Sequence, residues 1–197
     1  MNTDGFAEWF LASGIVVLLL ALVAGVLAVM FFLRTNDERR LQIFLNEYAQ
    51  SFLSHVVLPD GLGDYIFADY LLLHEDTIVV LNVMHKRGYV FGGKNIDEWT
   101  CVENHTTEKF KNPLPNLNMF AHAIQHELGF SHVETYLLFD SQSDFAKGVP
   151  EGVLQLNSLQ DMLEKGAEKK DASEETLKAW QQLKSLSDDT KILVGER

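Results

Sequence analysis

Two apolar stretches on either side of a polar turn, between Ile66 and Gly93, constrain the fold of this chain more than any other feature. β-Branched and aromatic residues crowd both stretches, and the segment 74–77 between them carries turn-forming residues. The pattern predicts a β-hairpin. Asp69 lies near the start of its first strand, while Asn82 and Met84 lie two apart on the second. Residues two apart on a strand point to the same face, so Asn82 and Met84 share one.

A second feature is the run from Trp9 to Leu33, which contains no charged residue and is almost entirely apolar. As a helix it would rise roughly 37 Å, enough to span a hydrocarbon core of about 30 Å. A cleaved signal peptide is the alternative, but the residues before the run are acidic and no small-residue cleavage site follows it. Residues 9–33 are therefore predicted to form a transmembrane helix after a short extracytoplasmic segment, 1–8.

The charge around this run predicts its orientation. Arg34, Arg39 and Arg40 follow it, whereas no Lys or Arg precedes it, which places the N-terminus outside and the rest of the chain in the cytoplasm. We expect a single-pass protein of a bacterial-type inner (plasma) membrane, with the lipid bilayer as its partner. Ala21 and Gly25 form a small-residue pair that could seat another membrane protein, but such pairs are common and leave the oligomeric state open.

The residues after the membrane segment alternate between strand and helix signals. A strand, helix, strand order with a final near-continuous apolar strand favours a parallel pair inside a sheet covered on both faces. We predict an α/β domain over 34–165 with a mixed sheet flanked by helices, then a C-terminal helix and tail over 166–197. The predicted elements are helix 38–52, strands 55–58, 66–73, 78–84, 87–91 and 99–102, helix 116–128, strands 133–139 and 153–156, and helices 158–165 and 173–187.

Composition excludes some functions. The formal charge of −12 disfavours binding to a polyanion, so we do not expect nucleic acid as a partner. Cys101 is the only cysteine, which rules out an intramolecular disulfide and a multi-cysteine metal site. It is read as a small buried apolar residue. His122 and His126 would share a helix face, with His132 nearby, but their order is not that of the zinc proteases and ordinary surface histidines are favoured.

Three segments together resemble the nuclease-related domain family, NERD. They are TIVVLNVMHKRGYVFGG at 77–93, KFKNPL at 109–114 and YLLFDSQSDFAKGVPEGV at 136–153. The resemblance covers 38–163. It implies a restriction-endonuclease-like fold, in which an Asp and a following Glu-x-Lys on adjacent strands form a metal-dependent nuclease site.

Carried onto this chain, the resemblance implies a degenerate site. The Asp falls on Asp69, the Glu on Asn82 and the Lys on Met84, while Glu38 matches the acidic residue that opens the first helix. Hard divalent cations are held mainly by carboxylates, and Met84 offers neither a proton nor a positive charge. Asp69 could then bind a metal ion only weakly, and no cofactor is expected. The chain is predicted to be a pseudo-nuclease that acts as a binding or scaffold module.

One further family motif differs in this chain, and the roles of Asp69 and of the basic residues 85–87 have alternatives. The helix after the Asn-Pro motif usually carries a Gln-Asn pair, and this chain has Asn116 and Leu117 there. Asp69 could also be an ordinary strand-end residue that faces solvent. The basic residues His85, Lys86 and Arg87 could meet a phosphate, although such a string is more typical of a solvated strand end.

The alternative hypothesis is a residual nuclease or nucleic-acid processing protein. In it, Asp69, Glu38 and Asn82 hold Mg²⁺ or Mn²⁺, and a lysine from elsewhere, Lys86 or Lys94, replaces the missing one. This alternative predicts that one of the two amines lies close to Asp69.

Overall fold

The computed structural model describes residues 20–26, 39–61, 63–140, 142–167 and 172–195. The chain divides into two compact units, 1–45 and 46–197. In the first unit the described residues are helical. No helix in the described part of the chain has the length and hydropathy of a membrane span. Most of the predicted span 9–33 lies outside the described residues, as does Glu38.

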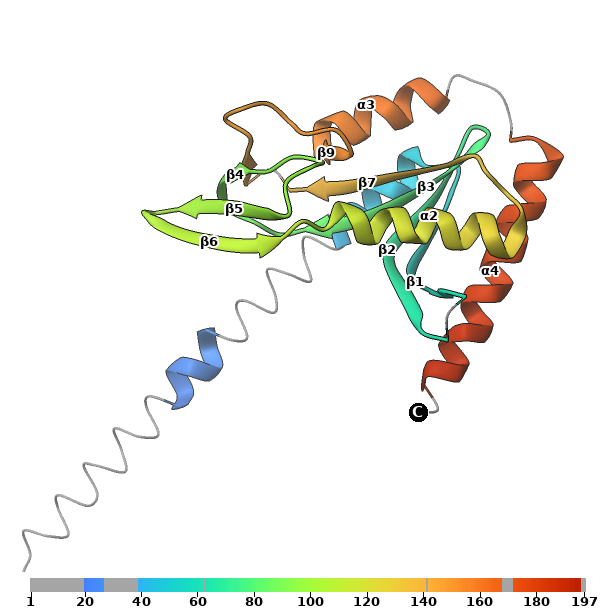
Figure 1. The fold of residues 1–197 in the computed structure, drawn as a ribbon, viewed down its shortest axis with the longest axis horizontal. Helices are drawn as coiled ribbons and strands as arrows, with labels where there is room; N and C mark the ends of the chain where they lie inside the picture. The colour runs from blue at the N-terminus through green and yellow to red at the C-terminus, as the bar shows by residue number, and fades with distance from the viewer. Residues whose placement is uncertain (1–19, 27–38, 62, 141, 168–171, 196–197) are drawn as a thin grey trace, which may run out of the picture. The chain divides into compact units, whose positions relative to one another are not determined.

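The second unit is mixed α/β, with two mixed sheets flanked by helices (Figure 1). A five-stranded sheet has the order β1-β2-β3-β7-β9, and a four-stranded sheet has the order β6-β5-β4-β8. The elements are β1 (Ser51–Pro59), β2 (Tyr65–His74), β3 (Thr77–Met84), β4 (Gly88–Phe91), β5 (Glu98–Glu103), β6 (Thr106–Lys111), α2 (Leu114–Leu128), β7 (Val133–Phe139), β8 (Ser143–Asp144), β9 (Val153–Gln155), α3 (Leu156–Ala167) and α4 (Glu174–Gly195).

The predicted hairpin is confirmed as β2 and β3, which pair antiparallel from Tyr70–Leu81 to His74–Thr77. A parallel pair is present as predicted, formed by β3 and β7 in register from Ile78–Val133 to Met84–Phe139. The predicted strand directly before the helix, 99–102, belongs to the smaller sheet instead. Consecutive residues in the middle of β3, such as Val79 and Val80, are fully buried although they point to opposite faces, so both faces of the sheet are covered there. The apolar runs of β3 and β7 are explained by this double burial.

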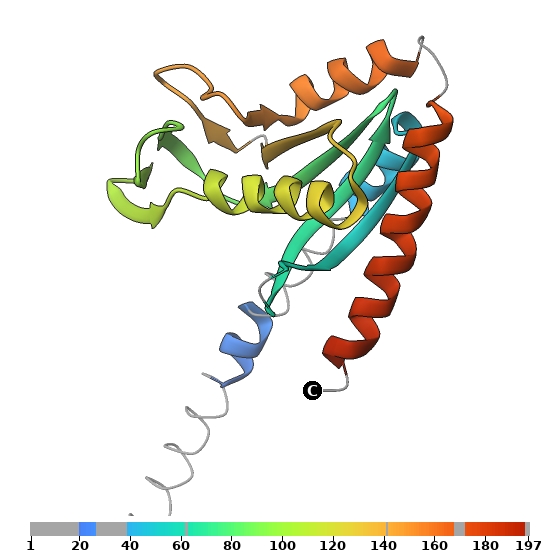
Figure 2. The same ribbon diagram turned by 45° about the vertical axis from the view of Figure 1, so that its right-hand side comes forward.

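One hydrophobic core joins the sheets and two helices. Leu117, Phe120 and Ile124 of α2 pack with Ile78 and Val80 of β3 and with the apolar residues of α4. Figure 2 shows α2 across one face of the larger sheet and α4 along its β1 side. Gly129, in the left-handed conformation at φ 66°, ends α2 as its sequence position predicts.

Trp99 connects the two sheets. Its ring stacks on Phe139 of β7 at a centroid distance of 6.3 Å, and its Nε1 donates to the carbonyl of Gly93. A Cβ on Gly92 would come within 2.2 Å of the indole, so only glycine fits there. The smaller sheet is thereby held at the carboxyl end of β7.

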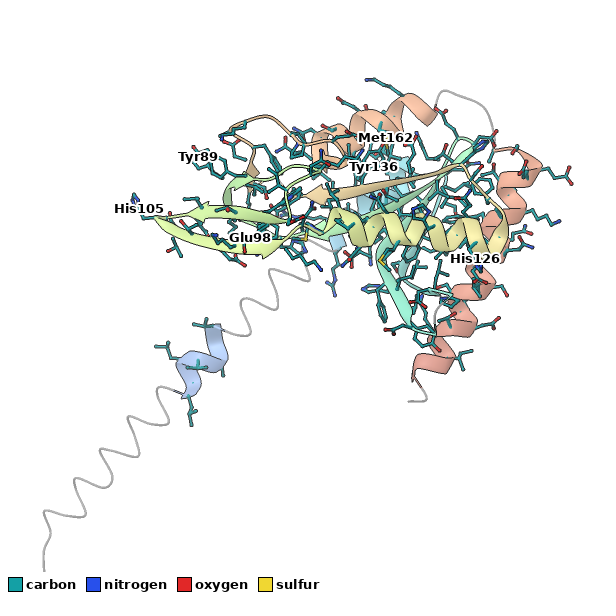
Figure 3. All side chains as sticks on the ribbon, viewed as in Figure 1. Tyr89, Glu98, His105, His126, Tyr136 and Met162 are labelled. Carbon is teal, nitrogen blue, oxygen red and sulfur yellow. The ribbon has the colours of Figure 1, made fainter. Side chains whose placement is uncertain are left out.

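Two predicted helix ends are wrong, and one strand was not predicted. The helix predicted over 38–52 ends at residue 48, and Phe52 lies in β1, where its ring packs on Tyr70 at 6.3 Å. Strand β6 was missed, because its residues are mostly polar and exposed and its pairing depends on a turn with Asn104 and His105 in the left-handed region. Figure 3 shows His105 at the tip of this hairpin. Helix α4 continues to Gly195, because Ser187 and Thr190 extend its buried face.

Candidate functional site

The position expected for the site coincides with a break in the larger sheet. The β2–β3 ladder stops at Tyr70–Leu81, one residue short of the place where Asp69 would face Asn82. The β1–β2 ladder also lacks one pair, His55 opposite Asp69, although the pairs on both sides of it are present. His55, Asp69 and Asn82 therefore occupy one row across three adjacent strands.

Side-chain oxygens bridge β2 and β3 where the backbone pairing ends. The Asn82 Oδ1 accepts a hydrogen bond from the Asp69 amide at 3.0 Å, and the Asp69 Oδ2 accepts one from the Val83 amide at 2.7 Å. Both bonds are partly buried. A bond from a backbone amide to a carboxylate is charge-assisted and is stronger than a neutral one. Asp69 and Asn82 thus hold the two strands together at the break.

At this row, the alternation of core-facing residues along β1 and β2 is interrupted. On β2, Leu71 and Leu73 after Asp69 belong to the main core, and so does Ala68 before it. The step from Ala68 to Leu71 is three residues instead of two. On β1 the corresponding change occurs at His55, whose φ of 52° lies in the left-handed region. Because side chains alternate with a period of two, an odd step between core residues requires such a break.

The structure places the other predicted site residues as follows. Asn82 and Met84 lie on the β3 face that also carries Val80, opposite Leu137 and Phe139 of β7. Met84 is partly buried and packs against the core. Asp69 and Asn82 are thus brought together, with Met84 one row further along the same face.

This arrangement offers limited metal-binding chemistry. Asp69 supplies one charged oxygen donor, and its Oδ2 already accepts a backbone hydrogen bond. Asn82 contributes a neutral oxygen that is also occupied by a backbone amide. Within the described residues, no group of three His, Cys, Asp or Glu side chains is suited to hold a metal ion. Mg²⁺ and Ca²⁺ sites are usually built from several oxygens that include carboxylates.

Carboxylates accompany two of the three basic residues after β3. The His85 Nδ1 lies 3.5 Å from the Asp140 Oδ2, and the Lys86 Nζ lies 2.5 Å from the Glu108 Oε1. Arg87 is exposed. A phosphate would have to compete with these two acidic partners.

The two lysines of the alternative hypothesis are engaged elsewhere. The Lys86 amine, besides its pair with Glu108, lies 4.8 Å from the centre of the Phe110 ring. The Lys94 amine pairs with Glu151 at 2.7 Å. Neither amine has a hydrogen bond or ion pair with Asp69 among the described contacts.

The remaining sequence candidates have ordinary surroundings. His126 is 77% exposed and pairs with the neighbouring Glu127, while His132 contacts the Phe130 ring edge-on. Cys101 is buried and donates to the carbonyl of Arg87, and burial raises the pKa of its thiol. A thiol with a raised pKa is a poor nucleophile at neutral pH.

Sequence reasoning missed two residues at this site. His55 marks the break in β1, where the core residues Leu53 and Val56 are three apart. Apolar residues are adjacent on both sides of His55, so no alternation in the sequence marks the break. Asp140, the last residue of the Leu-Leu-Phe-Asp string, pairs with His85 because β3 and β7 are parallel and end at the same sheet edge.

A family model described as the nuclease-related domain, NERD, matches residues 29–140, more than half of the chain. The chain belongs to the NERD family. The match ends at Asp140, directly after β7, so β8, β9, α3 and α4 lie beyond it. Comparisons with curated proteins and with solved structures found no match. The family assignment makes the protein nuclease-related. The row of Asp69 and Asn82 is its candidate functional site.

Proposed function

We propose that this NERD protein is a pseudo-nuclease that serves as a binding or scaffold module. One observation carries the proposal: the side-chain oxygens of Asp69 and Asn82 both accept backbone hydrogen bonds that close the break between β2 and β3. In the nuclease site that the resemblance implies, two carboxylates hold the metal ion and a lysine positions or polarises the attacking water. In this chain the row supplies one carboxylate, and a methionine stands at the lysine position.

The surroundings of the row support the same conclusion. Lys86 and Lys94, which could replace the missing lysine, are paired with Glu108 and Glu151. The overall charge of −12 repels a polyanionic substrate. The restriction-endonuclease-like fold remains part of the proposal, supported by the antiparallel β2–β3 hairpin beside the parallel β7.

We also propose that residues 9–33 anchor the protein in the plasma membrane with the NERD domain in the cytoplasm. The proposal rests on the uncharged run and on the arginines that follow it. The test is fractionation of cells that express the full chain with a C-terminal tag, followed by alkaline carbonate extraction and by protease treatment of spheroplasts. Release of the protein by carbonate, or digestion of the tag in intact spheroplasts, would contradict the anchor or its orientation.

The catalytic part is tested with the full chain purified in mild detergent. The protein is incubated with linear DNA or single-stranded RNA in Mg²⁺ or Mn²⁺, beside Asp69→Asn as the matched control. We expect no cleavage above the level of the control, because Asn82 and Met84 supply neither charge nor proton. Cleavage by the wild type that disappears in Asp69→Asn would show a working nuclease and would overturn the proposal.

A further inference from the structure

The edge of the larger sheet at β7 is only partly covered. Strand β9 pairs with Leu137, Leu138 and Phe139 and with no earlier residue of β7. The chain enters β9 through a turn at 151–152, in which Gly152 has a φ of 82°, a left-handed value that glycine adopts easily. In the described part of the chain, the first half of β7, Val133–Tyr136, therefore has a neighbouring strand on its β3 side alone.

The backbone of Thr135 points to this open edge. The Leu137 amide donates to the carbonyl of Gly152 at 2.9 Å, so the polar groups of Leu137 face the β9 side. Backbone groups alternate in direction along a strand, which directs the N–H and C=O of Thr135 to the same side. Open edge groups of this kind are the usual docking points for an added strand.

A pocket of about 300 Å³ lies at this edge. It is lined by Thr135 and Tyr136 of β7, by Leu114 and Asn118 of α2, and by Gly152 just before β9. The Thr135 hydroxyl donates to the Asn118 Oδ1 at 3.2 Å, which holds α2 beside the strand. This volume is at the lower end for ligand sites, so it suits one side chain with its backbone better than a drug-sized molecule or a cofactor.

The charges around the pocket favour a cation. Lys94 and Glu151 pair across the rim at 2.7 Å and neutralise each other, although their side chains are 57% and 78% exposed. Glu134 also lines the pocket, and its Oε2 accepts a hydrogen bond from the Tyr136 hydroxyl at 2.9 Å. Burial, together with Glu134, raises the pKa of Tyr136 to about 12, so the phenol stays neutral. Figure 3 shows Tyr136 on β7. Among the described residues that line the pocket, Glu134 has no ion pair, so the lining carries one net negative charge.

We propose that the open edge of β7 binds an extended basic peptide segment of a partner protein. The peptide backbone pairs with the N–H and C=O of Thr135, and a Lys or Arg side chain enters the pocket toward Glu134. Main-chain hydrogen bonds supply the binding and the pocket supplies the preference for a basic residue. The inference goes beyond the proposed function by giving the binding module a site and a class of partner.

The test uses the full chain in mild detergent and two capped peptides, Thr-Val-Lys-Val-Thr and Thr-Val-Glu-Val-Thr. Titrations are followed by peptide fluorescence anisotropy and by the backbone amide signals of the protein. We expect the Lys peptide to bind at least about tenfold more tightly than the Glu peptide and to shift the Thr135 amide. Absence of binding, equal binding of both peptides, or shifts that spare Thr135 would overturn the proposal.

Two variants at one position separate the edge from the side chain. Thr135→Pro removes the amide that faces the open edge and should weaken binding of the Lys peptide by about tenfold or more, while the ladder to β3 is kept. Thr135→Val removes only the bond to Asn118 and should bind within about twofold of wild type. Equal loss in both variants would count against edge pairing.

A third variant keeps the test valid if Thr135→Pro fails to fold. Glu134→Gln preserves the shape of the pocket and should reduce the preference for Lys over Glu by about tenfold. An unchanged preference would refute the role of Glu134. Failure here is distinct from failure of the proposed function, because the cleavage assay with Asp69→Asn does not involve β7, and an active nuclease could still bind the peptide.

Discussion

The hairpin of β2 and β3 carries two aspartates that do similar work in different settings. Asp69, near the open end of the hairpin, accepts the Val83 amide at 2.7 Å across two adjacent strands. Asp76, in the turn at the other end, accepts the Ser173 amide at 2.7 Å and the Thr176 hydroxyl at 2.8 Å. The second group of bonds reaches α4, about a hundred residues away and beyond the family match.

The difference lies in burial and in partner. The bonds of Asp69 are partly buried within the sheet, whereas the carboxylate of Asp76 is at the surface and meets the N-terminus of a helix. A catalytic carboxylate needs its oxygens available for a metal ion or a substrate. Asp69, like Asp76, instead uses an oxygen to accept a hydrogen bond from a backbone amide. The comparison therefore supports a structural role for the carboxylate of Asp69.

The largest effect is expected at α4, which Asp76 positions. Trp180→Ala removes a nearly fully buried ring from the core shared with α2 and should lower the free energy of unfolding by about 3–5 kcal/mol. Urea denaturation measures the loss. Leu177→Ala, at a 40% exposed position on the same helix, is the matched control and should cost far less. Equal losses would mean that α4 is not packed as described.

The next effect tests Asp69 directly. Asp69→Ala leaves the Val83 amide without its acceptor in a partly buried site and should lower the free energy of unfolding by about 1–3 kcal/mol. Asp69→Asn keeps an acceptor oxygen and should lose much less. If Asp69→Ala instead raised stability, as substitution of a strained catalytic residue often does, the structural role of Asp69 would be refuted.

The sequence predicted the parts of the fold whose local signals agree with tertiary context. The β2–β3 hairpin, β7 and α2 have strong periodicity and clear turn or capping residues, and their positions are right within a few residues. Strand β6 carries polar, exposed residues and is held mainly by pairing with β5, so nothing in its own composition marks it. Phe52 falls by chance at a position that continues the apolar stripe of the preceding helix. It is a strand residue because β1 pairs with β2, which the sequence of this segment does not show.

The candidate site was predictable in part. The resemblance predicted that Asp69, Asn82 and Met84 belong to one site, and the structure places Asp69 and Asn82 at one break in the sheet. Their use as backbone acceptors depends on where two ladders stop, which is a property of strand pairing and not of residue identity. The open edge at Thr135 was invisible for the same reason, because it follows from how late β9 joins β7.

A smaller effect is expected at the cap of α4. Ser173 accepts the Thr176 amide at 3.3 Å through its hydroxyl, the pattern of a helix N-cap. Ser173→Ala should lower the free energy of unfolding by about 1 kcal/mol and should speed hydrogen exchange of the first turn of α4. Ser173→Asp, which restores a capping oxygen but brings a second carboxylate beside Asp76, separates capping from charge. It should recover part of the loss at low pH and less at pH 7.

The smallest effect is a pH dependence that belongs to Asp76. Hydrogen bonds from Ser173 and Thr176 lower the pKa of Asp76 from 3.8 to about 2. A carboxyl group with a lowered pKa in the folded state stabilises the protein above its unfolded pKa and loses that contribution as the pH falls through the folded one. The difference in urea midpoint between wild type and Asp76→Asn should therefore be constant near neutral pH and should shrink between about pH 4 and pH 2. Asp76→Asn is the suitable variant because it retains an acceptor oxygen for both donors and removes only the charge. A difference that stays constant down to pH 2 would show that the charge of Asp76 does not stabilise the start of α4, and the parallel with Asp69 would then rest on hydrogen bonding alone.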